Sequence, residues 1–317
     1  MRSLNDTLRR LSQLRDHPGA GALDASVEDR LSDLPAFGSN PGALRGRLYV
    51  PRSPDASPAL VVVLHGCTQS AAGYDHGSGW SRLADAQGFA LLYPEQQRGN
   101  NANLCFNWFH PGDTRRDAGE ALSIRQMIAA MVARHGIDPA RIFVTGLSAG
   151  GAMASVMLAA YPELFAGGAI IAGLPYGTAA SIPEAFDRMR AQGGPPPAAL
   201  GALVTAASPH RGPWPTISVW HGDRDATVSH ANSALIVEQW RTIHELACEP
   251  SAVEHVGGHL RRVWRDADGR DAEDDLVRSE AVAASRCPGA LLLCARCTSS
   301  TICARCWWPW WTTCASP

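Results

Sequence analysis

The stretch RIFVTGLSAGGAMASVML, residues 141–158, decides which fold this chain is predicted to adopt. It opens with a short β-branched and aromatic run, continues through a serine framed by glycines, and ends in a run rich in Ala, Met and Leu. The pentapeptide Gly146-Leu147-Ser148-Ala149-Gly150 within it fits the pattern G-x-S-x-G, with a predicted strand before it and a predicted helix after it.

This pattern has a chemical purpose as well as a shape. A turn this tight leaves no room for side chains at either end, and it lifts the serine hydroxyl out of the sheet at a helix N-terminus. There the helix dipole and the free backbone N–H groups stabilise a developing negative charge. A serine in a Gly-rich turn is usually only part of the turn, but the flanking strand and helix favour a nucleophile. We therefore predict that Ser148 is catalytic.

Predicted strands and helices alternate on both sides of this motif. Such alternation implies a parallel sheet with helices on both faces, so we expect a single doubly wound α/β domain over about residues 40–275. Residues 1–39 are predicted to form an amphipathic helix and a linker, and residues 178–213 a Pro/Gly/Ala-rich insertion. The predicted strands are 44–51, 59–67, 89–95, 141–146, 166–175 and 216–223, and the predicted helices are 79–88, 151–161, 231–246 and one that starts at Asp117.

The helix that starts at Asp117 carries a recognisable N-terminal signature. Glu120 follows Asp117 by three residues, which is the spacing of a capping box. We therefore expect the Asp117 side chain to cap the first turn.

A second part of the expected catalytic machinery lies at Leu64-His65-Gly66-Cys67, where a buried strand ends. In folds of this kind, a turn at this place exposes a backbone N–H that joins the N–H of the residue after the nucleophile. We predict that the amides of Cys67 and Ala149 form an oxyanion hole. Only the backbone is needed for this role, so the His65 and Cys67 side chains can be those of an ordinary buried turn.

The carboxylate that orients a catalytic histidine is expected just after a late strand, in the chain order Ser, Asp, His. The run His221-Gly222-Asp223-Arg224-Asp225 follows such a strand. We favour Asp225 for this role, because the run places it at the loop tip before Val228 returns to the core. Asp223 is the reserve, and an unpaired surface aspartate is the alternative for either residue.

Several of these segments together resemble the polyhydroxybutyrate (PHB) depolymerase family of α/β-hydrolase esterases. The resemblance extends over about residues 40–270 and rests on LHGCTQSAAGYDHGSGW, NNANLCFNWFHPGD, GLSAGGAM and HGDRDATV. It implies an α/β-hydrolase fold with a mostly parallel central sheet, with Ser148 as nucleophile, Asp225 as its acid and Cys67 as an oxyanion donor. Trp108 is a candidate wall of the substrate cleft, or else a loop anchor packed on the core.

The function implied by the resemblance is hydrolysis of aliphatic hydroxyalkanoate esters. Feruloyl and acetylxylan esterases are relatives of the family, so an esterase of that type is an alternative. In the family, a strand like the DADGR segment at 266–270 continues into a glycine-rich turn that carries the catalytic histidine, but no histidine occurs after His259 in this chain. His244, His255 and His259 match no functional position of the family. A catalytically impaired protein that binds esters or polyesters is therefore the other alternative.

The composition changes sharply toward the C-terminus. Six cysteines and four tryptophans lie between Cys287 and Pro317, without an acidic residue. We favour a shift of the reading frame near residue 275, which removes the final strand and the C-terminal helix of the fold and leaves residues 276–317 disordered or poorly packed. The rival is a zinc site made by two C-x-x-C pairs, Cys294 with Cys297 and Cys303 with Cys306, although the gap between the pairs is short for such a site.

Charge and hydropathy exclude other classes of protein. A net charge of −2 provides no basic field for nucleic acid, and no apolar run approaches the ~20 residues that cross a bilayer. The residues of the body imply no cofactor and no metal. Without a secretory signal we expect a cytoplasmic protein, with Cys67, Cys105 and Cys248 as thiols, although many members of the family are extracellular.

Overall fold

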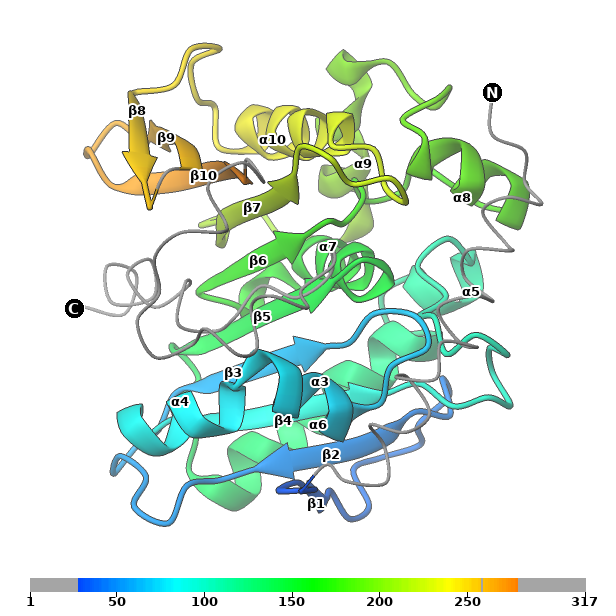
Figure 1. The fold of residues 1–317 in the computed structure, drawn as a ribbon, viewed down its shortest axis with the longest axis vertical. Helices are drawn as coiled ribbons and strands as arrows, with labels where there is room; N and C mark the ends of the chain where they lie inside the picture. Colours follow the sequence, from blue (N-terminus) through cyan, green and yellow to red (C-terminus); the bar gives the residue numbers. More distant parts are fainter. Residues whose placement is uncertain (1–27, 258, 279–317) are drawn as a thin grey trace.

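The computed structural model describes residues 28–257 and 259–278 of the 317-residue chain. They contain one ten-stranded sheet in the order β1-β2-β4-β3-β5-β6-β7-β10-β9-β8 (Figure 1). The expected N-terminal amphipathic helix and the Cys/Trp-rich segment lie outside the described residues. The strands are β1 (Ser32–Asp33), β2 (Arg45–Tyr49), β3 (Leu60–Leu64), β4 (Ala90–Glu95), β5 (Ile142–Leu147), β6 (Gly167–Ile171), β7 (Thr216–Gly222), β8 (Ala252–Val256), β9 (His259–Arg265) and β10 (Asp271–Arg278).

The centre of the sheet is parallel and its two margins are antiparallel. Strands β4, β3, β5, β6, β7 and β10 run in one direction, whereas β2, β1, β9 and β8 pair antiparallel at the margins. Every residue of β3, β5 and β6 is buried, as expected for strands covered on both faces. The predicted mostly parallel α/β sheet is confirmed.

Helices cover both faces of this sheet, and each face has its own hydrophobic core. The larger core packs α6 (Gly119–His135), α7 (Ala149–Ala160), α9 (Leu200–Ala207) and α10 (Ala231–Ile243), and the smaller core packs α3 (Ala71–Ser78) and α4 (Trp80–Gln87). All residues of α7 are buried, because its Ala, Gly, Met and Leu side chains present no polar face to solvent. The shorter helices are α5 (Pro111–Thr114), η1 (Pro162–Leu164), α8 (Ile182–Met189) and η2 (Pro197–Ala199).

The capping prediction at Asp117 was wrong. Helix α6 starts at Gly119 after Ala118, and no side chain caps it. Asp117 instead takes a positive φ of 63°, and its N–H donates to the Tyr161 hydroxyl at 2.6 Å. Glu120 points into the interior and is 1% exposed, so it is unavailable for a capping box.

The Pro/Gly/Ala-rich insertion at 178–213 contains α8 and α9. One further expectation needs correction at the C-terminal side of the domain. The final strand is present: β10 pairs parallel with β7 from Glu273↔Ile217 to Arg278↔Gly222. A change of reading frame near residue 275 therefore does not remove the strand.

Strand β10 nevertheless carries residues that do not suit a strand in the interior of a sheet. Glu273, Asp274 and Asp275 are 1%, 1% and 0% exposed. Arg261 pairs with Asp274 at 2.9 Å and Arg262 with Asp275, but neither Glu273 oxygen has a hydrogen-bond partner within the described residues. Burial is the main cause that raises the pKa of Glu273 well above its usual range and that of Asp274 to about 6.

Candidate active site

Ser148 occupies the sharp turn between β5 and α7. Its backbone has φ 56° and ψ −116°, a strained conformation for a residue with a side chain. The turn is fixed by two backbone hydrogen bonds: the Ser148 N–H donates to the Ile171 carbonyl, and the Ser148 carbonyl accepts from the Ala152 N–H, both at 2.9 Å. These bonds hold the serine at the carboxyl edge of the sheet, as predicted for a nucleophile.

The two framing glycines are required by close backbone contacts. A Cβ on Gly146 would lie 2.2 Å from the Gly150 carbonyl oxygen. A Cβ on Gly150 would lie 2.3 Å from the Leu64 oxygen and 2.5 Å from the His65 oxygen. Gly150 thus allows the first turn of α7 to approach the end of β3, which brings the nucleophile turn beside the predicted oxyanion turn.

Both predicted oxyanion donors are in suitable places. Ala149 is the first residue of α7, so its N–H belongs to the first-turn amides that have no acceptor within the helix. The Cys67 N–H donates to no acceptor in the part of the chain that the structure describes. Both amides are therefore free to bind a developing oxyanion.

The His65 ring is fixed in one protonation state by its two neighbours. The Gln96 backbone N–H can only donate, so it makes His65 Nε2 the acceptor at 3.1 Å. The proton therefore lies on Nδ1, which donates to the Gly66 carbonyl at 2.7 Å. The ring is 1% exposed, and burial lowers the pKa of His65 to about 4. Its side chain, which we expected to be dispensable, thus holds the carbonyl of the Gly66–Cys67 peptide whose N–H is the predicted oxyanion donor.

Cys67 is tied to a loop far along the chain. It forms a disulfide with Cys105 across a sequence separation of 38, so the expectation that both are thiols was wrong. The adjacent Thr68 N–H donates to the Asn103 carbonyl at 2.7 Å. Cys248 is an exposed free cysteine. The disulfide and the hydrogen bond together attach the oxyanion turn to the aromatic loop, which we define as residues 98–110.

The aromatic loop is itself anchored on a buried carboxyl group. Glu120 accepts from Gln96 Nε2 at 2.6 Å and from the Asn107 N–H at 2.9 Å, and burial raises the pKa of Glu120 to about 8. Trp108 is 9% exposed and belongs to the larger core, with its ring edge-on to Phe109. This placement favours the loop-anchor interpretation of Trp108 over the cleft-wall interpretation.

The loop after β7 presents Asp225 rather than Asp223 as an ordered carboxylate. Asp225 Oδ1 accepts from the Thr227 N–H at 2.8 Å and from the Val228 N–H at 3.0 Å, and the Asp225 side chain is 10% exposed. Its Oδ2 is 3.6 Å from His221 Nε2, beyond hydrogen-bond distance. Asp223 is exposed. The geometry therefore favours Asp225 as the acid.

Two histidines lie close to Asp225 in the sequence, but neither is bonded to the nucleophile. His221 is buried and its Nε2 donates to the Val228 carbonyl at 3.0 Å, which closes the loop; His230 is exposed before α10. Within residues 28–257 and 259–278, no side chain hydrogen-bonds the Ser148 hydroxyl.

The other histidines considered from the sequence lie elsewhere. His244 ends α10 with Nε2 on the Pro215 carbonyl at 3.1 Å, and His255 and His259 lie on β8 and β9 at the sheet margin. The structure also indicates where a catalytic histidine is expected. Strand β10 ends with Arg278 beside Gly222, which opens the Asp225 loop, and the sequence after Arg278 contains no histidine.

Other kinds of site find no support in the described part of the chain. No group of three or more His, Cys, Asp or Glu side chains is arranged there to hold a metal ion. None of its helices combines the length and apolar character that crossing a bilayer requires. The four cysteines of the rival zinc interpretation lie beyond the described residues.

A mostly parallel α/β sheet with a strained serine between a strand and a helix defines the α/β-hydrolase class. The comparison with known families agrees: the sequence model described as esterase PHB depolymerase matches residues 45–263. The chain belongs to this family, which confirms the resemblance and the fold class predicted from the sequence.

Individual relatives are esterases of several kinds. Poly(3-hydroxyalkanoate) depolymerase C of Paucimonas lemoignei is 47% identical over 83% of this chain and 64% of its own length. Acetylxylan esterase of Coprinopsis cinerea is 31% identical over 70% of this chain and 61% of its own length, and feruloyl esterase B of Talaromyces funiculosus is 32% identical over 74% and 69%. The chain thus spans less than two thirds of the first two relatives.

A solved structure supports the fold independently. An acetyl xylan esterase from Aspergillus awamori superposes with a TM-score of 0.71, over 79% of this chain and 92% of that chain, at 24% sequence identity. At this identity the likeness concerns the fold.

Proposed function

We propose that this protein is a carboxylic ester hydrolase in which Ser148 attacks the ester carbonyl, the Cys67 and Ala149 amides bind the oxyanion, and Asp225 is the acid of the site. The observation that carries the proposal is the strained serine turn packed against the turn at Cys67, whose N–H has no partner among the residues that the structure describes. Family membership supports the same reaction.

The proposed substrates are aliphatic hydroxyalkanoate-type esters. The greater identity to a poly(3-hydroxyalkanoate) depolymerase, 47% against 31% and 32% for an acetylxylan and a feruloyl esterase, favours this class. Esters of the acetylxylan or feruloyl type are the alternative substrates. No cofactor takes part in the proposed reaction.

The proposed activity of this chain is slow, because no general base lies beside Ser148 within residues 28–257 and 259–278. A serine hydroxyl without a base is a weak nucleophile near neutral pH. Enzymes that lose one member of a triad keep roughly 10³–10⁴-fold acceleration over water through the oxyanion hole and substrate binding. If the residual rate of hydrolysis is zero, the protein is the catalytically impaired ester-binding protein that we gave as an alternative.

Rescue by added imidazole tests the proposal. Hydrolysis of p-nitrophenyl butyrate is measured with and without imidazole for the unaltered chain and for Ser148→Ala, which also corrects for hydrolysis by imidazole itself. We expect imidazole to raise the Ser148-dependent rate by at least about tenfold, a part of the 10²–10⁴-fold that a positioned base contributes. Equal rates for the two proteins, with and without imidazole, would overturn the proposed function.

A fast Ser148-dependent reaction without imidazole would have a different meaning. It would show that a histidine of the chain reaches the serine, and the missing-base proposal would fail. His221→Gln and His230→Gln then identify the base, because these two histidines lie nearest to Asp225 in the chain and His221 lies 3.6 Å from it in space.

We further propose that the protein works in an oxidising compartment, which is the extracellular alternative. The Cys67–Cys105 pairing supports this location, because disulfides persist in secreted proteins and are rare in the cytosol. Alkylation of the purified chain without reductant, followed by peptide mapping, is expected to recover a linked Cys67–Cys105 peptide pair. Recovery of both cysteines as alkylated thiols would contradict the proposed compartment.

A further inference from the structure

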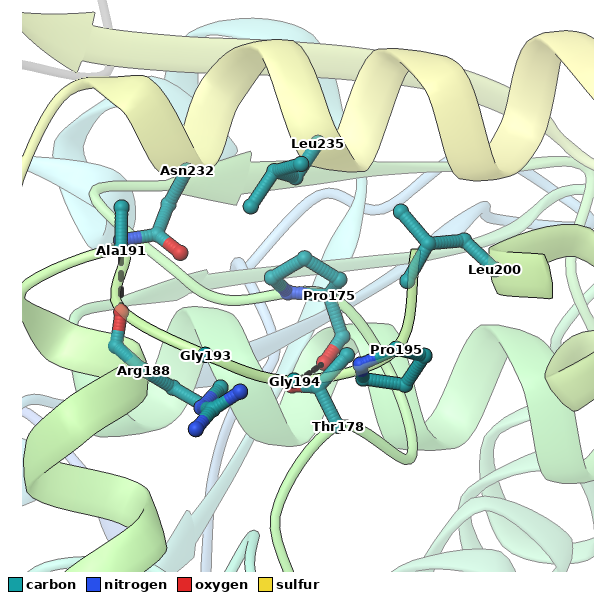
Figure 2. A pocket seen from close by; sticks show the side chains of 10 residues that line it. All are labelled: Pro175, Thr178, Arg188, Ala191, Gly193, Gly194, Pro195, Leu200, Asn232 and Leu235. Atoms are coloured by element: carbon teal, nitrogen blue, oxygen red, sulfur yellow. Dashed lines mark hydrogen bonds between the residues drawn. The ribbon is translucent and has the colours of Figure 1, made fainter. Parts of the chain in front are cut away.

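A small cavity beside the Asp225 loop is lined by an arginine, Arg188, whose guanidinium is not ion-paired within the described residues. The cavity lies between the segment after β6, helix α8 with the loop that follows it, and α10 (Figure 2). The empty space within and in front of it is about 250 Å³ with open solvent included, so the cavity is shallow. Its apolar walls are Pro175, Pro195, Leu200 and Leu235, and Arg188 and Asn232 are polar residues at its border.

The Arg188 guanidinium has no counter-charge. Its Nε and Nη1 atoms are buried and have no hydrogen-bond partner, and no salt bridge to Arg188 occurs within the described residues. The carboxylates on the same helix are engaged elsewhere: Asp187 pairs with Arg190 at 2.6 Å, and Glu184 accepts from the Ala180 N–H at 2.7 Å. A buried donor without an acceptor is unfavourable, so an acceptor atom on a bound ligand would stabilise these two nitrogen atoms.

The chain around Arg188 fixes its backbone and leaves room for its guanidinium. The Arg188 carbonyl accepts from the Ala191 N–H at 2.8 Å and from Asn232 Nδ2 at 3.0 Å. Gly193 and Gly194 have positive φ values of 66° and 88°. A Cβ on them would lie 2.6 Å from Nη2 and 2.1 Å from Nη1, so only glycines leave room for the guanidinium, which reaches toward them in Figure 2.

The cavity is also close to the candidate active site in the fold. Pro175 follows β6, whose last residue Ile171 accepts the Ser148 N–H, and Asn232 follows the Asp225 loop at the start of α10. Helix α8 lies beyond the carboxyl ends of the parallel strands (Figure 1), which is the edge where Ser148 and Asp225 are found.

We infer that this cavity binds the carboxylate of a short aliphatic acid, with Arg188 as the binding residue. A guanidinium presents parallel N–H groups, Nη2 with either Nε or Nη1, that match the two oxygens of a carboxylate. The proline and leucine side chains suit a short alkyl chain. The identity of the acid rests on the proposed function: a hydroxyalkanoate esterase meets carboxylates as its acid product and as the free end of an oligoester chain.

Calorimetric titration of the full chain carrying Ser148→Ala, which cannot hydrolyse the ligand through the serine, tests the inference. The ligands are 3-hydroxybutyrate, its linear dimer with a free carboxylate, and the methyl ester of that dimer. We expect at least one free acid to bind and the methyl ester to bind at least about tenfold more weakly, because the ester is neutral and its second oxygen is a poor hydrogen-bond acceptor. Binding of the monomer alone identifies a product site, and binding of the dimer acid identifies a chain-end site.

Two arginine variants provide the matched comparison. Adding Arg188→Gln is expected to weaken binding at least about tenfold, whereas Arg190→Gln, two residues away and already ion-paired, leaves it unchanged. Arg188→Lys keeps the positive charge but loses the two parallel N–H groups of the guanidinium, so we expect an intermediate affinity. Circular dichroism verifies that each variant is folded. Equal binding by the Arg188→Gln variant, or no binding of either acid, would overturn the inference. Because the binding assay needs no turnover, its failure is distinguishable from failure of the imidazole assay.

Discussion

At the scale of single residues, the candidate site depends on backbone groups whose orientation is set by buried side chains. Ser148 has an unfavourable φ of 56°, a conformation that costs roughly 1–3 kcal/mol and persists only where neighbours enforce it. On the opposite side of the site, the buried side chain of His65 orients the backbone N–H of Cys67. Because Nδ1 binds the Gly66 carbonyl, the N–H at the other side of the same peptide unit is directed away from His65.

Substitution of His65 separates this orienting role from simple packing. In His65→Asn the side-chain amide can replace Nδ1–H toward Gly66, whereas in His65→Gln it can replace Nε2 toward the Gln96 N–H. We expect Asn to retain most of the imidazole-rescued kcat and Gln to lose about 10- to 100-fold with little change in KM, since a misdirected oxyanion donor costs up to about 10²–10³.

The same variants also predict an order of stability. His65→Ala leaves the buried Gln96 N–H unpaired and should destabilise the fold by about 1–3 kcal/mol in urea unfolding. Equal kcat for the Asn and Gln variants would show that the ring only fills space.

At the scale of elements, the oxyanion turn, the aromatic loop and helix α6 form one connected unit. The Cys67–Cys105 disulfide joins the first two, and Glu120 joins the loop to α6 through Gln96 and Asn107. Glu120 is buried, so its carboxyl group is more easily accommodated in the protonated form.

The raised pKa of Glu120 predicts a loss of stability at mildly alkaline pH. The folded protein holds this proton up to about pH 8, whereas the unfolded chain releases it near 4.5. The folded state therefore binds more protons in this window, and the free energy of unfolding falls as pH rises. The buried His65, whose pKa is lowered to about 4, acts in the opposite direction only below about 6.5.

Urea unfolding at pH 6.5 and pH 8 measures this effect. We expect the unaltered chain to lose about 1–2 kcal/mol from Glu120 over this interval, and Glu120→Gln to lose correspondingly less. An identical pH dependence in the two proteins would mean that Glu120 is ionised in the folded state throughout this range.

At the scale of the whole molecule, the weak point of the fold is β10. A strand between β7 and β9 should contribute apolar side chains to both faces, but β10 places Glu273, Asp274 and Asp275 in the interior. This mismatch agrees with the frameshift interpretation and moves the expected break upstream, to the turn before Asp271. The coding DNA read in another frame from that point is expected to encode an apolar strand followed by a histidine.

Replacement of the least satisfied of these carboxylates is expected to stabilise the protein. Glu273→Val removes two buried oxygens without partners and should raise the free energy of unfolding by about 1–3 kcal/mol, measured in urea at pH 7. Glu249→Val, at an exposed position, is the matched control and should change stability by less than about 0.5 kcal/mol. Destabilisation by Glu273→Val would show that this carboxylate has a favourable partner in solution.

By itself the sequence determined the features that depend on neighbours in the chain: the alternating strands and helices, the serine turn at Ser148, the turn at Cys67 and the loop that carries Asp225. Local periodicity and the residues of tight turns can be recognised within a few residues of sequence. Only the tertiary structure decided the Cys67–Cys105 pairing, the tautomer of His65, the burial of Glu120 and the isolation of Arg188. Each depends on groups brought together across the sheet, and burial there, rather than local propensity, sets both charge state and bonding.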